Sequence, residues 1–179
     1  MSKILIVVDM QNDFITGSLG TKEAETVVER VVEKIEEYKK QGHQVFYTRD
    51  THNETYLNTS EGKKLPVIHC VKGTSGWQLA PAVEKTVTSE EQIYDKETFG
   101  AIKLGEKMKH LSEKEAELEI ELIGVCTDIC VISNALLIKA YVPEAVISVD
   151  AACCAGVTPE SHINALSAMK MCQIEILNE

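Results

Sequence analysis

Short apolar runs alternate with amphipathic stretches along the chain. Residues 3–8 form a continuous apolar run, which is typical of a strand buried on both faces of a parallel sheet. Residues 22–40 place apolar side chains at helical spacing, with Thr21 as a cap and Gly42 after the end. The same reasoning predicts the remaining strands at residues 44–48, 92–95, 118–123, 145–149 and 173–177, and helices at 80–86, 101–110, 131–140 and 159–171.

Strands that alternate with helices predict the α/β class, with a mainly parallel six-stranded sheet between two helical layers (α/β/α). A chain of 179 residues suits a single domain, which we place at residues 1–179. In such sheets the functional site lies beyond the carboxyl ends of the strands. Residues that follow strands are therefore the first candidates for chemistry.

Charge and cysteine usage narrow the range of functions. A net charge of −10 argues against nucleic acid or an anionic membrane as the main partner. The sequence shows neither a membrane span nor a signal peptide, so we expect a cytoplasmic protein whose six cysteines stay reduced. The absence of a Cys-x-x-Cys motif argues against a zinc site made only of cysteines.

Two cysteines lie in the turn between a predicted strand and a predicted helix. If Thr127 caps the helix, Cys130 falls in its first turn, where the helix dipole favours a thiolate and hence a nucleophile. The alternative is that Cys130 is a small buried core residue. Position alone does not separate these two interpretations.

Two charged residues also follow predicted strands. Asp9 ends the first strand and Lys96 ends the third, so both are expected at the same rim of the sheet as Cys130. Asp9 would take the thiol proton, and Lys96 would stabilise the thiolate. None of the five histidines is placed for an obvious cysteine–histidine pair. Taken singly, Asp9 is consistent with a strand-end cap, and Lys96 is consistent with a surface charge. The occurrence of Asp9, Lys96 and Cys130 at three strand ends favours catalysis.

A second group of polar residues suggests a metal site. Asp50-x-His52 follows the second strand, and His69 lies in the long irregular segment that continues to about residue 80. One carboxylate and two imidazoles are a common ligand set for a divalent transition metal ion, namely zinc, iron or manganese. Glu61 or a water would add a fourth ligand. The alternative is that these are ordinary histidines without a functional role. We give that interpretation to His43, His110 and His162, because they fall in helical or flanking positions without partners.

Five segments carry a resemblance to a known family: residues 7–14, 48–52, 69–74, 96–100 and 124–130. In these segments the chain resembles the isochorismatase-like cysteine hydrolases, and most closely their nicotinamidase-related amidase branch. The resemblance implies the isochorismatase-like hydrolase fold, with catalytic residues Asp9, Lys96 and Cys130. It also implies metal ligands Asp50, His52, His69 and Glu61.

The resemblance extends to the turn before Cys130 and to the substrate pocket. It implies a cis peptide bond between Val125 and Cys126, with the amides of Cys126 and Cys130 forming the oxyanion hole. Phe14 matches an aromatic residue that lines the ring pocket. The chain departs from the pattern where nicotinamidases commonly have an aromatic residue, since it has Pro66 preceded by Leu65, which we expect to contact the substrate instead. It also has Cys126 where alanine is usual.

Together these features predict a metal-dependent cysteine amidase of NAD metabolism. It would hydrolyse a small, heteroaromatic amide such as nicotinamide to the acid and ammonia through a thioester. The alternatives are another small substrate, such as an aliphatic amide, an N-carbamoyl compound or isochorismate, and a non-catalytic metabolite-binding protein on the same fold. We also expect the chain to form a homo-oligomer.

Overall fold

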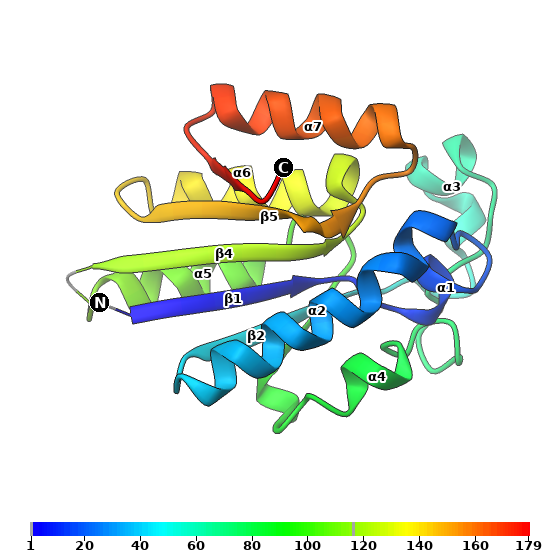
Figure 1. Ribbon diagram of the computed structural model, residues 1–179. Coiled ribbons are helices and arrows are strands. Elements are labelled where there is room, and N and C mark those ends of the chain that lie inside the picture. Colours follow the sequence, from blue (N-terminus) through cyan, green and yellow to red (C-terminus); the bar gives the residue numbers. More distant parts are fainter. Residues whose placement is uncertain (1, 116) are drawn as a thin grey trace.

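The computed structural model describes residues 2–115 and 117–179. It contains one sheet of six parallel strands in the order β3-β2-β1-β4-β5-β6 (Figure 1). The strands are β1 (Ser2–Val8), β2 (Gln44–Asp50), β3 (Ile93–Lys96), β4 (Leu118–Val125), β5 (Val146–Ala155) and β6 (Glu175–Leu177). The predicted α/β class and six-stranded parallel sheet are therefore confirmed.

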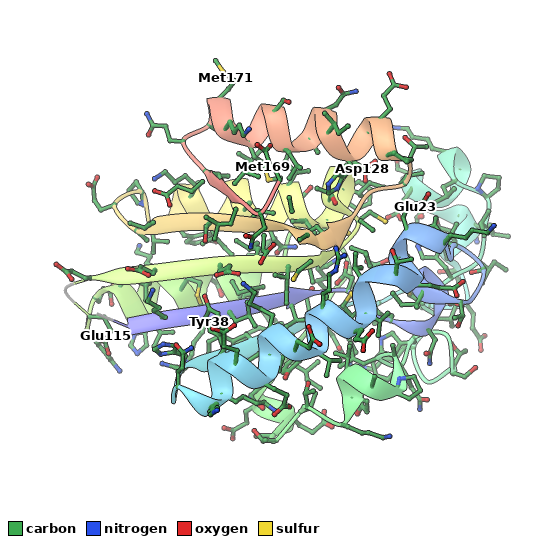
Figure 2. The ribbon with its side chains drawn as sticks, in the orientation of Figure 1. Glu23, Tyr38, Glu115, Asp128, Met169 and Met171 are labelled. Atoms are coloured by element: carbon green, nitrogen blue, oxygen red, sulfur yellow. The ribbon has the colours of Figure 1, made fainter. Side chains whose placement is uncertain are left out.

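Helices cover both faces of the sheet, which makes three layers. Figure 1 shows α2 in front of the sheet and α5 and α6 behind it. One core contains α1 (Asn12–Ile15), α2 (Lys22–Lys40) and α4 (Pro81–Glu84), and the other contains α5 (Ile102–Ser112), α6 (Ile132–Tyr141) and α7 (Pro159–Met171). The fully buried Met169 lies between α7 and the sheet, whereas Met171 projects from α7 into solvent (Figure 2).

The central strand β1 shows why the sheet needs both layers. Its side chains alternate between the two cores: Ile4, Ile6 and Val8 face α5, α6 and α7, while Leu5 and Val7 face α2. All five are fully buried. Burying each such side chain contributes roughly 1.5–3 kcal/mol. The continuous apolar run of this strand therefore stabilises the sheet from both sides.

The topology places the site at the centre of the sheet. The chain runs outward from β1 through β2 to β3, and then crosses back to β4 on the other side of β1. Val8 pairs with Gly124 at the carboxyl ends of β1 and β4. Gly124 has φ +115°, and a Cβ atom on it would lie 2.2 Å from Val8 O, so only glycine allows the two strands to meet here. The crevice that accepts ligands in open α/β sheets opens at such a reversal of strand order.

Several element boundaries differ from the sequence prediction. Strand β2 continues to Asp50, which brings this candidate ligand onto the sheet, and β4 continues to Val125, directly before Cys126. Strand β5 runs to Ala155, beyond the predicted end at residue 149, because Cys154 and Ala155 pair with the end of β4. The predicted cap at Thr21 is present, since its hydroxyl accepts a hydrogen bond from Ala24 N. Among the described residues, none of the helices has the length and apolar character that crossing a bilayer requires.

Candidate active site

Three residues from separate elements meet at the carboxyl rim of the sheet. Asp9 directly follows β1, Lys96 ends β3, and Cys130 lies in the π-helix η3 (Thr127–Val131) after β4. Lys96 Nζ lies 2.8 Å from Asp9 Oδ2 and donates a hydrogen bond to Cys130 Sγ at 3.4 Å. All three are buried. The arrangement brings a thiol, a carboxylate and an ammonium into one contact group, as the positions at strand ends predicted.

The burial of this group controls its protonation. Burial raises the pKa of the Cys130 thiol well above its usual value and the charge of Asp9 adds to this, while Lys96 opposes it. Burial also raises the pKa of Asp9, although the ammonium of Lys96 works in the other direction. The resting group therefore holds its proton on Cys130, next to a carboxylate that binds protons more readily than usual. A helix dipole favours the thiolate, but the loss of hydration on burial outweighs that effect here.

The backbone and a neighbouring hydroxyl fix the orientation of Asp9. Thr48 Oγ1 donates to Asp9 Oδ1 at 2.6 Å, and Asp9 N donates back to Thr48 Oγ1 at 3.2 Å. Asp9 has φ +48°, an uncommon conformation for a residue with a side chain. Apart from its ion pair with Lys96, Asp9 Oδ2 has no hydrogen-bond partner among the described residues. That oxygen remains able to accept a proton.

The turn that carries Cys130 differs from the predicted capped helix. The peptide bond between Val125 and Cys126 is cis, as the resemblance implied. Cys126 O accepts hydrogen bonds from Ile129 N and Val131 N, so the chain enters a π-helix before α6 begins at Ile132. Thr127 was predicted to cap this helix, and that prediction is wrong.

The Thr127 hydroxyl instead lies 2.8 Å from His162 Nδ1 of α7. His162 therefore has a partner, contrary to our expectation. Asn134 holds the other side of the turn, because its amide donates to Cys130 O and accepts from Ala101 N. The turn is thus braced by side chains from α6 and α7.

Beside the group of Asp9, Lys96 and Cys130, four further residues gather their ligand atoms in one place. The ligand atoms of Asp50, His52, Glu61 and His69 all lie within 4.8 Å of one another. Asp50 Oδ2 lies 2.9 Å from His52 Nε2 and 3.4 Å from His69 Nε2. Apart from this contact with Asp50, His52 Nε2 is buried without a hydrogen-bond partner among the described residues, which is unfavourable unless another group binds it. Two imidazoles and two carboxylates fit a divalent transition metal ion well.

Neighbouring groups hold these ligands in place. His69 Nδ1 lies 2.8 Å from Val67 O and so carries the proton, which leaves Nε2 free for the cluster. The side chain of Gln11 donates to Asp50 O and accepts from Asp50 N, both within 2.8 Å. Burial alone would raise the pKa of Asp50, but the two imidazoles and Lys96 lower it below its usual range. Asp50 is therefore ionised, as a metal ligand must be.

The residues expected to bind substrate occupy different places. Phe14 is nearly buried, and its ring centroid lies 5.6 Å from that of His69. It therefore borders the metal cluster, as we call the four candidate ligands Asp50, His52, Glu61 and His69. Leu65 follows α3 (Ser60–Lys64) and is 37 % exposed, with its carbonyl oxygen bound by the hydroxyl of Tyr56. Sequence reasoning missed Tyr56, Gln11 and Asn134. Only Gln11 stood in a segment that the resemblance covered.

A family model for the isochorismatase domain matches residues 3–178. The chain belongs to the isochorismatase domain family. The resemblance inferred from the sequence is thereby confirmed, and the order of the matched segments agrees with a match that covers almost all of the chain.

Relatives in the isochorismatase domain family include nicotinamidases. The nicotinamidase of Saccharomyces cerevisiae is 30% identical over 173 residues, which cover 75% of this chain and 80% of that protein. An isochorismatase family protein of Bacillus subtilis, PncA, is 31% identical over 93% of both chains. The crystal structure of the pyrazinamidase of Pyrococcus horikoshii in complex with zinc superposes with a TM-score of 0.81 at 26% identity, covering 100% of both chains.

Proposed function

We propose that this protein is a metal-dependent amidase that hydrolyses nicotinamide to nicotinic acid and ammonia. The observation that carries the proposal is the contact of Lys96 with both Asp9 and Cys130, directly beside the cluster of Asp50, His52, Glu61 and His69. The similarity to nicotinamidases supports the substrate class. A free thiol next to a carboxylate supports nucleophilic catalysis rather than attack by a metal-bound water.

In the first half of the reaction Cys130 is the nucleophile. Asp9 takes the thiol proton as Cys130 Sγ bonds to the amide carbon, and the carbonyl oxygen becomes an oxyanion. The backbone amides of Cys126 and Cys130 are our candidates for stabilising that oxygen. Asp9 then gives its proton to the amide nitrogen, the C–N bond breaks, and ammonia leaves a thioester on Cys130.

Water completes the reaction. Asp9, again a carboxylate, takes a proton from a water molecule whose oxygen bonds to the thioester carbon. The C–S bond then breaks, and the proton returns from Asp9 to Cys130 Sγ as the carboxylic acid departs. Lys96 keeps its charge throughout, since Asp9, Cys130 and Asp50 raise its pKa despite the opposing effect of burial. Its positive charge therefore stabilises the carboxylate of Asp9 or the thiolate of Cys130, whichever is present.

The metal cluster would bind and orient the substrate. Asp50, His52, His69 and Glu61 would hold the ion, and zinc, iron and manganese all suit this ligand set. When bound, the ion supplies a Lewis-acid site for a ring nitrogen. Phe14, which packs beside His69, would contact the flat ring. Leu65 would contribute an apolar contact in place of an aromatic one.

Ammonia release from a panel of amides tests the proposal. Nicotinamide and pyrazinamide should both be hydrolysed by the zinc-loaded protein, and benzamide, which lacks a ring nitrogen, should be hydrolysed far more slowly. The Cys130→Ala variant is the control for contaminating amidases. If an aliphatic amide or an N-carbamoyl compound releases ammonia and nicotinamide does not, the aliphatic residues Leu65 and Pro66 mark a different substrate pocket and the nicotinamide proposal fails.

A further inference from the structure

Tyr56 packs against two of the residues that form the metal cluster. Its ring centroid lies 4.5 Å from that of His52 and 4.9 Å from that of His69, at interplanar angles of 53° and 78°. The side chain is 1 % exposed, although its neighbours at residues 53–55 and 57–60 are exposed. With 1 % of its surface exposed, the ring has no free face for a substrate. Its contacts are with the imidazoles themselves.

Tyr56 also closes the loop that carries Glu61. Its hydroxyl donates to Leu65 O at 2.9 Å, across nine residues of chain. Its own carbonyl oxygen accepts hydrogen bonds from Thr59 N and Thr59 Oγ1 just before α3. A Cβ atom on Gly62 would lie 2.2 Å from Tyr56 O, so α3 packs directly on the Tyr56 backbone. Glu61, in the first turn of α3, then points its carboxylate within 3.7 Å of His52 Nε2 and 3.8 Å of His69 Nε2.

We infer that Tyr56 is a positioning residue for the metal cluster, holding the rings of His52 and His69 through its own ring and bringing Glu61 to them through its hydroxyl. Imidazoles that are free to rotate must be ordered when an ion binds, and this costs affinity. The buried ring of Tyr56 restricts both imidazoles before the ion binds, so this entropic cost is smaller. Groups that orient metal ligands typically contribute 10–100-fold to metal affinity.

The two parts of the side chain should make separable contributions. Tyr56→Phe keeps the ring against His52 and His69 but removes the hydrogen bond to Leu65 O. Tyr56→Ala removes both. Tyr47→Phe is a matched control, because Tyr47 is also fully buried and its hydroxyl also donates to a backbone carbonyl, that of Thr86. This control loses the same kind of hydrogen bond outside the metal cluster.

The experiment measures the zinc dissociation constant of metal-stripped proteins by competition with a chromophoric chelator. We expect weakening of about 10–100-fold for Tyr56→Ala, a smaller loss for Tyr56→Phe, and no change for Tyr47→Phe. Melting temperatures of the metal-free proteins are measured alongside. A purely structural role of Tyr56 would lower the melting temperature of the metal-free protein and leave the zinc dissociation constant unchanged, which would overturn the inference.

This inference rests on the proposed function, and the same experiment separates the two. If the wild-type protein binds zinc and hydrolyses nicotinamide while Tyr56→Ala binds zinc equally well, only the role of Tyr56 is wrong. If the wild-type protein binds zinc but releases no ammonia from nicotinamide, the affinity series still decides the role of Tyr56. If the wild-type protein does not bind zinc, iron or manganese, both proposals fail.

Discussion

Lys96 Nζ lies 3.3 Å from Oδ1 of Asp50, so the proposed nucleophile and the metal cluster share one buried cation. The same ammonium contacts Asp9 and Cys130. Replacing Lys96 should therefore change the reactivity of the Cys130 thiol, which an alkylating reagent measures directly.

Lys96→Met should slow alkylation of Cys130 by iodoacetamide at neutral pH. Lys96 lowers the pKa of Cys130 against the effect of burial, so its loss leaves less thiolate. Each further unit of pKa reduces the thiolate about tenfold. Peptide-resolved mass spectrometry measures the rate at Cys130, and Lys139→Met, whose lysine binds Pro143 O on the surface, serves as the control. An alkylation rate equal to that of the wild type would remove Lys96 from the site.

The pH dependence of alkylation should distinguish Cys130 from an ordinary cysteine. An unperturbed thiol has a pKa of about 8.5, so its alkylation rate levels off above pH 9–10. Because the pKa of Cys130 is raised, the charged form appears only at higher pH, and the rate at Cys130 should still be rising there. A plateau at or below pH 8.5 would mean that the resting residue is a thiolate.

The two cysteines of the turn should behave differently when each is replaced. Cys130→Ala should abolish ammonia release and leave the circular dichroism spectrum unchanged, because only one sulfur atom is lost. Cys126→Ala should retain most of the activity, since the proposed contribution of Cys126 comes from its backbone amide. The opposite pattern of activities would identify Cys126 as the nucleophile.

Purified protein should contain about one divalent transition metal ion per chain, as the four-residue ligand set predicts. Elemental analysis should find little metal in the His52→Ala/His69→Ala double variant. His110→Ala, which changes an exposed histidine of α5, should retain the metal. Stripping the ion with a chelator should also lower the melting temperature, since the ion binds only the folded chain. Full occupancy in the double variant would place the ion elsewhere.

Pro66→Trp should lower the KM for nicotinamide. An aromatic contact is worth about 0.5–1.5 kcal/mol beyond its buried area, which corresponds to roughly two- to tenfold in binding. The kcat should stay the same, because the added ring contacts the pyridine and not the reacting carbonyl. Steady-state kinetics separate the two constants, and a fall in kcat without a change in KM would argue against stacking at this position.

The parts of the site that could be predicted are those fixed by strand ends. Asp9, Lys96 and the Cys126–Cys130 turn follow strands of a parallel sheet, and parallel strands bring their carboxyl ends to one edge. Tyr56 could not be found in this way. It lies in an irregular loop, and its burial depends on contacts with His52, His69 and Leu65 that no local pattern encodes. The end of β5 was missed for a related reason, since its small side chains carry no strand preference and pairing with β4 alone makes it a strand.

The wrong prediction at Thr127 has a different cause. Threonine before a helix is a good cap by local rules, but here the hydroxyl contacts His162 on a helix that comes later in the chain. At Cys130 a helix dipole favours the thiolate, but burial of the sulfur and the charge of Asp9 raise the pKa of the thiol. In both cases a tertiary environment overrode a local preference.

The close contact of Gly124 with Val8 limits which parts of the protein can change without disturbing the site. The proposed base Asp9 directly follows β1, and the turn that carries the proposed nucleophile Cys130 follows β4. The two strands touch without a side chain between them, so the positions from which both segments start are fixed. In the loop of residues 53–68 the comparable constraints fall on Tyr56, Glu61 and Gly62, whereas many of its other side chains face solvent. Directed evolution towards new amides should therefore randomise the exposed positions of that loop and leave Tyr56, Glu61, Gly62 and the contact between β1 and β4 unchanged.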